Sequence, residues 1–118
     1  MKEILLTKVT HDELEVLQIE LEHYAQVQRI GFASWNIEDF LNAIATADIA
    51  HRLWLVFRKR LESDSTHFRF SYKASDAVIL FKCCNWERNG RNDYQRHVCR
   101  KYQDIIDNQF KSIIPKQQ

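Results

Sequence analysis

The scarcity of turn-forming residues is the feature of this sequence that most restricts its fold. The chain of 118 residues holds two glycines and one proline, where average usage predicts about fourteen of these residues together. Folds built from many strands need frequent turns rich in glycine and proline, so a shortage of both indicates long elements. The sequence therefore favours an all-α fold.

Length and composition indicate an ordinary globular domain. Hydrophobic residues make up 45% of the chain and charged residues 28%, as in a typical soluble protein. A chain of this length is expected to form a single helical domain over residues 1–118. An apolar run such as Ala77–Phe81 covers only five residues, and the N-terminal stretch lacks the features of a secretory signal. We therefore expect a cytoplasmic protein with no membrane partner.

Charge is distributed unevenly along the chain. The net charge is +1, but residues 1–66 carry seven basic and eleven acidic residues, and residues 67–118 carry ten and five. Oppositely charged halves can attract each other within one fold or pair between two copies of the chain. A protein partner, with a homodimer as one form, is therefore expected.

Two helices are predicted in the first half of the chain. Thr10 and Glu13 have the spacing of a capping box, and apolar residues at helical spacing follow them, which predicts a helix start at this point. Ser34 or Asn36 can cap a second helix that reaches about Glu62. The short connection between the two helices predicts an antiparallel hairpin.

The segment after the second helix has a different pattern. Phe68, Phe70 and Tyr72 alternate with polar residues, as residues do along a strand. A lone strand would have no partner in a helical chain. We therefore interpret residues 63–74 as an irregular or short extended connection whose aromatic side chains cover the end of a bundle. A short hairpin or an earlier start of the next helix are the alternatives.

The second half of the chain predicts another pair of helices. Ser75 can cap a third helix that is apolar on nearly all sides and stops at Gly90, and such a helix is expected to be central and buried. A fourth helix is predicted from near Asn92 to about Ile114. Together the four helices predict an antiparallel four-helix bundle built from two helical hairpins.

A basic cluster surrounds the predicted turn at Gly90. A helix, a glycine turn and a second helix with a basic leading edge resemble in outline a helix-turn-helix motif. The near-zero net charge argues against this reading, because DNA-binding domains gain affinity by neutralising phosphates. A solvated turn, or a patch that docks on the acidic face of another copy, is the competing interpretation. The candidate nucleic-acid-binding residues are Arg88, Arg91, Arg96, Arg100 and Lys101.

A second cluster has the residue types of a metal site. Each of the first two predicted helices carries a carboxylate and an imidazole three residues apart, namely Glu20 with His23 and Asp48 with His51. Di-metal carboxylate bundles use such pairs together with further carboxylates from the other helices. The last two predicted helices offer only Glu87, near a helix end, and Asp104 and Asp107, at or outside the margin of the inner face. A metal-binding bundle is therefore only an alternative, a hydrogen-bonded network or partial exposure at the side of the bundle is the favoured interpretation, and no cofactor is expected.

The cysteines and the missing catalytic motifs argue against an enzyme. Cys83 and Cys84 are adjacent on a predicted helix, where neighbouring side chains diverge by about 100° and do not readily bind one ion. We interpret them as reduced, buried core residues. The sequence has no glycine-rich phosphate loop and no paired-histidine zinc motif. These observations favour a non-enzymatic protein.

The aromatic content indicates an association surface. Three tryptophans, seven phenylalanines and four tyrosines exceed what the core of a small bundle needs, and exposed apolar patches mark interaction sites. The principal functional hypothesis is a small regulatory or accessory protein that binds another protein, itself first. The candidate interaction residues are Trp35, Trp54, Phe57 and Trp86.

Overall fold

The computed structural model describes residues 3–30 and 36–113, and within them it contains both helices and strands. The predicted all-α four-helix bundle is therefore wrong, because the described chain is mixed α/β. The elements in chain order are β1 (Ile4–Thr10), α1 (His11–Ile30), α2 (Ile37–Leu61), β2 (His67–Tyr72), α3 (Ala74–Asn85) and α4 (Asp93–Phe110).

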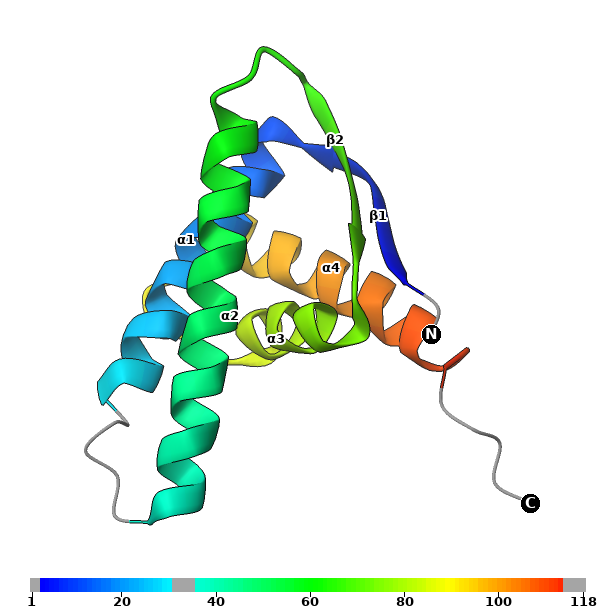
Figure 1. The fold of residues 1–118 in the computed structure, drawn as a ribbon. Coiled ribbons are helices and arrows are strands. Elements are labelled where there is room, and N and C mark those ends of the chain that lie inside the picture. The colour runs from blue at the N-terminus through cyan, green and yellow to red at the C-terminus, as the bar shows by residue number, and fades with distance from the viewer. Residues whose placement is uncertain (1–2, 31–35, 114–118) are drawn as a thin grey trace.

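The two strands form an antiparallel ribbon at one side of the molecule (Figure 1). Ile4 lies opposite Tyr72, and Thr10 lies opposite His67. Phe68, Phe70 and Tyr72 face the core, as their alternation with polar residues requires. The segment interpreted as a connection thus contains a strand, and its partner is supplied by the first residues of the chain.

The caps of the first two helices lie at residues that the sequence predicts. The Thr10 amide donates to a Glu13 carboxylate oxygen at 3.0 Å, and the Glu13 amide donates to the Thr10 hydroxyl at 3.1 Å. This reciprocal pair is the predicted capping box. At the start of α2, the Asn36 side chain accepts from the Asp39 amide at 2.8 Å. The other candidate cap, Ser34, lies outside the described residues.

The last two helices differ more from the prediction. The cap position of α3 is Lys73, whose side chain makes no capping hydrogen bond, so the expected cap at Ser75 is wrong. That helix ends at Asn85, before the expected stop at Gly90. Helix α4 begins next to Asn92 as predicted, and Asn92 caps it through a capping box with Gln95.

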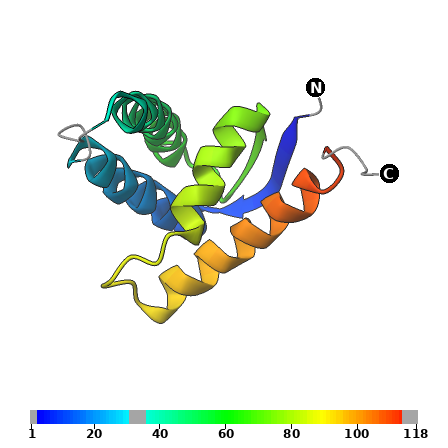
Figure 2. The same cartoon turned by 90° about the horizontal axis from the view of Figure 1, so that it is seen from below.

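The helices form two pairs that lie across each other. Helices α1 and α2 run side by side in opposite directions, and α3 and α4 form a second pair (Figures 1 and 2). In Figure 2, α2 is seen almost along its axis while α3 and α4 lie close to the plane of the picture. Both expected hairpins are present, but they do not align as one bundle.

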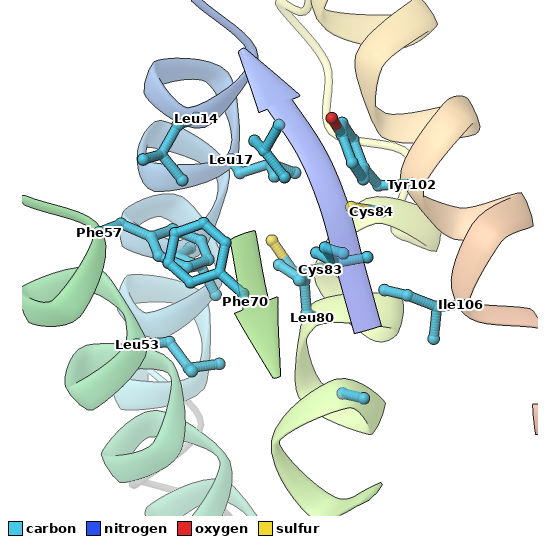
Figure 3. Close-up of a cluster of buried hydrophobic side chains, with 14 of the residues drawn as sticks. Leu14, Leu17, Leu53, Phe57, Phe70, Leu80, Cys83, Cys84, Tyr102 and Ile106 are labelled. Atoms are coloured by element: carbon cyan, nitrogen blue, oxygen red, sulfur yellow. The ribbon is translucent and has the colours of Figure 1, made fainter. Parts of the chain in front are cut away.

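All six elements contribute to the core (Figure 3). Phe57 of α2 is fully buried, and its ring lies 5.1 Å from the ring of Phe70 in β2, centroid to centroid. Cys83 and Cys84 of α3 are buried free thiols, as predicted. Tyr102 and Ile106 close the core from α4. None of the helices in the described residues combines the length and apolar character needed to cross a bilayer.

Candidate functional site

An arginine-lined hollow of about 520 Å³ opens where α3 ends and the chain turns into α4. The turn passes through Gly90, whose φ of 97° lies in the left-handed region that favours glycine. Asn92 then starts α4 by capping it. The charged residues lining the hollow are four arginines and two carboxylates, namely Arg88, Arg91, Arg96, Arg100, Glu87 and Asp104.

A buried carboxylate from α1 holds the turn in place. Glu20 is 1% exposed, and its two oxygens accept from Arg88 Nε at 2.7 Å and from Arg91 Nε at 2.6 Å. Arg91 also donates to the carbonyl oxygens of Cys83, at 2.9 Å, and Cys84, at 3.3 Å. These bonds satisfy carbonyls near the end of α3 that lack helical partners. The triad of Glu20, Arg88 and Arg91 therefore joins α1 to the turn between α3 and α4, and Arg91 links both to the end of α3.

The remaining basic residues have different environments. Arg96 pairs with Asp93 at 2.8 Å on the surface of α4. Lys101 does not line the hollow. Its ammonium donates to Glu13 at 2.6 Å. Within the described residues, Arg100 has no hydrogen-bond or ion-pair partner. The hollow thus brings together four of the five predicted nucleic-acid-binding residues.

Glu13 is the centre of a second buried polar cluster. Besides Lys101 and the Thr10 amide, it accepts a hydrogen bond from the Tyr102 hydroxyl at 2.7 Å. Burial alone would raise the pKa of Glu13, but the hydrogen bonds from Lys101, Thr10 and Tyr102 outweigh it and hold this pKa below its ordinary value. The same cluster raises the pKa of Tyr102, through burial and then through the bond to Glu13. Glu13 therefore stays ionised and fixes α4 to the start of α1.

The thiols at the hollow are not poised for chemistry. Cys84 and Cys99 both line it and both are buried. The hydrogen bond with Cys84, and then burial, raise the pKa of Cys99 far above its ordinary value. The pKa of Cys84 is raised as well, first by its hydrogen bond with Cys83. Because the thiolate is the nucleophilic form, neither cysteine is an activated nucleophile at neutral pH.

The structure does not bring the four predicted metal ligands together. Both oxygens of Glu20 are taken by arginines. Asp48 and His51 are exposed on α2, and the His51 ring stacks on Trp54 at 5.9 Å. Across residues 3–30 and 36–113, no group of three or more His, Cys, Asp or Glu side chains could hold a metal ion.

The predicted aromatic surface is only partly at the surface. Phe57 belongs to the core, so its expected place on an exposed patch is wrong. Trp54 is half-buried beneath the Arg58 guanidinium, which lies 5.5 Å from its ring. Trp86 is half-buried with its ring 5.7 Å from that of Tyr24. Trp35 lies outside the described residues.

The exposed apolar surface comes from aliphatic residues that sequence reasoning did not single out. Eight of the ten exposed large hydrophobic side chains in the described part of the chain lie on α1 and α2. Four of them share one face of α2 because they are spaced by helical turns. They lie apart from the buried residues of α2, which are Ala43, Ala47, Ala50, Leu53 and Phe57. We call this face the α2 stripe: Ile37, Leu41, Ile44 and Leu55.

Comparisons with protein-family models, curated proteins and solved structures find no match for this chain. Its function is therefore argued from its own residues.

Proposed function

We propose that this protein is a non-enzymatic binding module that associates through the α2 stripe, with a second copy of the chain as its first partner. The exposure of the stripe carries this proposal. Its side chains are between 40% and 71% exposed, and Ile37, Leu41 and Ile44 follow one another on successive turns of the same helix face. Exposed apolar surface of this kind on a small domain is typical of an association site. Helix α2 lies at the periphery of the molecule, where a partner can reach it (Figures 1 and 2).

The charges on the same face favour a second copy as the partner. Asp48 lies within the stripe, and His51 and Arg52 follow it one turn later. In an antiparallel pair of α2 helices with a two-fold axis midway between positions 48 and 51, Asp48 faces the partner subunit's His51. Ile44 then faces the partner subunit's Leu55. Two-fold symmetry makes each of these two contacts twice, so the part of the stripe from Ile44 to Leu55 is complementary to itself.

Within this proposal the protein acts as a small regulatory or accessory protein of the cytoplasm. The three cysteines support that location, because all three are buried and free rather than joined in disulfides. Unpaired thiols are the usual state in a reducing compartment.

Arg52 also lies near the proposed contact. It is 3.5 Å from Asp76 of α3 in a single chain, and in the dimer it would exchange that exposed pairing for contact with the partner subunit.

The oligomeric state of the full chain tests this proposal. We expect the wild-type protein to sediment at twice the monomer mass, and the double variant Ile44→Asp/Leu55→Asp to sediment as a monomer with unchanged helical circular dichroism. The matched control is Val78→Asp/Tyr94→Asp, which changes two exposed apolar residues on α3 and α4 and should remain dimeric. A wild-type protein that is monomeric up to about 1 mM, the limit of weak association, would overturn the proposal.

Charge exchange tests the antiparallel arrangement itself. Asp48→Lys should weaken dimerisation, because it removes a carboxylate that can accept a hydrogen bond from the partner subunit's His51. Adding His51→Glu to that variant places opposite charges across the two-fold axis and should restore the dimer. If the double variant dimerises no better than Asp48→Lys alone, this register of the two helices is wrong.

A further inference from the structure

We propose that the arginine-lined hollow binds the phosphate group of a small phosphorylated ligand of about nucleotide size. No residue of α2 lines this site, so it is separate from the α2 stripe and independent of the proposed dimer. The triad carries more positive than negative charge. One carboxylate, Glu20, faces two guanidiniums whose side chains are only 14% exposed for Arg88 and 6% exposed for Arg91. One positive charge is therefore left almost without water and without an acidic partner, a state that proteins usually balance.

The hollow gives an anion access to that charge. Arg88 and Arg91 both line it, so a ligand in the hollow would lie beside the unbalanced guanidiniums. Arg96 and Arg100 add two more guanidiniums from successive turns of α4. Arg100 is without a partner in the described chain, and Arg96 holds Asp93 through one terminal nitrogen. Free guanidinium donors arranged as a fork match the oxygens of a phosphate group.

The size of the hollow and its acidic residues favour a small ligand over a nucleic acid. Its volume of about 520 Å³ is within the usual range of small-molecule sites. Glu87 and Asp104 also line it, and they can accept hydrogen bonds from hydroxyl or amino groups of a small ligand. The same carboxylates, with Asp93 nearby, would repel the continuous charge of a polynucleotide. The net charge of the chain, +1, also gives little attraction for one.

Calorimetric titration of the full chain tests this proposal with three probes: adenosine monophosphate, inorganic phosphate and adenosine. We expect saturable binding of the monophosphate, weaker binding of inorganic phosphate and no binding of adenosine. The double variant Arg96→Ala/Arg100→Ala should weaken binding of the monophosphate by about tenfold or more, because it removes two charged donors. Both side chains are exposed, so this variant tests the site without breaking the buried triad.

The control removes two exposed basic side chains elsewhere, in Lys59→Ala/Arg69→Ala on α2 and β2, and should bind like the wild type. Equal weakening in both variants would show a general charge effect and overturn the proposal. So would equal binding of adenosine and its monophosphate, no saturable binding at all, or tighter, steeply salt-dependent binding of a single-stranded oligonucleotide. Monophosphate binding by Ile44→Asp/Leu55→Asp should be unchanged, which separates this result from the outcome of the dimer experiment.

Discussion

Glu20 illustrates what the sequence can and cannot show about a single residue. Its spacing from His23 on a predicted helix favoured a hydrogen-bonded network with that imidazole, with a metal site as the alternative. The partners in the structure are Arg88 and Arg91, and Arg88 lies 68 residues away. Helical periodicity identifies a buried charge, but it carries no information on which distant segment neutralises it.

Loss of the Glu20 carboxylate should destabilise the fold strongly. Glu20→Ala leaves two buried guanidiniums beside each other with no counter-charge, and removing one partner of a buried ion pair typically costs about 3–5 kcal/mol. Urea unfolding followed by circular dichroism measures this change. The control Glu22→Ala alters an exposed glutamate on the same helix and should change stability by less than about 0.5 kcal/mol. A similar result for the two variants would show that the triad adds no stability.

The lowered pKa of Glu13 predicts a dependence of stability on pH. Because the folded pKa lies below the ordinary value of 4.5, ionised Glu13 stabilises the fold fully above about pH 4.5. That contribution is lost as the pH falls through the folded pKa. The difference in unfolding free energy between wild type and Glu13→Gln should therefore be largest near neutral pH and should shrink in acid. Urea titrations at several pH values measure it, with Glu22→Gln as the control. A difference that is constant with pH would contradict the prediction.

At the scale of elements, the helices were predictable and the ribbon was not. The capping signals at Thr10 and Asn36 and the helix start near Asn92 are local, and the structure bears them out. Strand β1 gives a weaker signal, because its pairing with β2 shifts register between Leu6 and Val9. Both side chains are buried although they are three residues apart, so the strand lacks the strict alternation that reveals a half-buried strand. Without β1, the alternating aromatics of β2 had no visible partner.

The edge of β1 is closed by a side chain, which can be tested. The Leu5 amide donates to the Gln109 carboxamide oxygen at 2.7 Å, and the Gln109 nitrogen donates to the Leu5 carbonyl at 2.6 Å. Gln109→Ala should lower stability by about 1–2 kcal/mol, because two backbone groups lose their partner. It should also speed hydrogen exchange at the Leu5 amide.

The control for this prediction is Gln103→Ala. Gln103 also lies on α4, but its side chain donates to Asn85 in an exposed position. This variant should leave exchange at Leu5 unchanged. Unchanged exchange at Leu5 in the Gln109 variant would show that the side chain does not protect the strand edge.

At the scale of the whole molecule, the acidic and basic halves of the sequence form ion pairs with each other within one chain. Glu13 and Glu20 come from the acidic half, and their partners Lys101, Arg88 and Arg91 come from the basic half. Attraction within the fold was one of the two outcomes that the charge pattern allowed. These pairs fix α1 against the α3–α4 pair and account for several of the basic residues that had suggested nucleic-acid binding.

The N-terminal strand should be needed for the whole fold rather than for one edge of it. Ile4, Leu6 and Val9 are almost completely buried, and removal of residues 1–9 would take these side chains from the core and leave β2 without its paired strand. We expect that deletion to abolish cooperative thermal unfolding, as observed by calorimetry. Lys8→Ala, which changes an exposed residue of the same strand, should unfold like the wild type. A sharp transition in the deletion variant would show that the helices fold independently of the ribbon.

The order of the strands along the chain also affects how the protein is made. Strand β1 leaves the ribosome before β2, which begins only at His67, after the whole α1–α2 hairpin. At about 5–20 residues per second, the nascent strand waits for several seconds with its apolar side chains uncovered. During that interval it is a natural target for chaperones that bind chains still under synthesis, and slower translation prolongs its exposure.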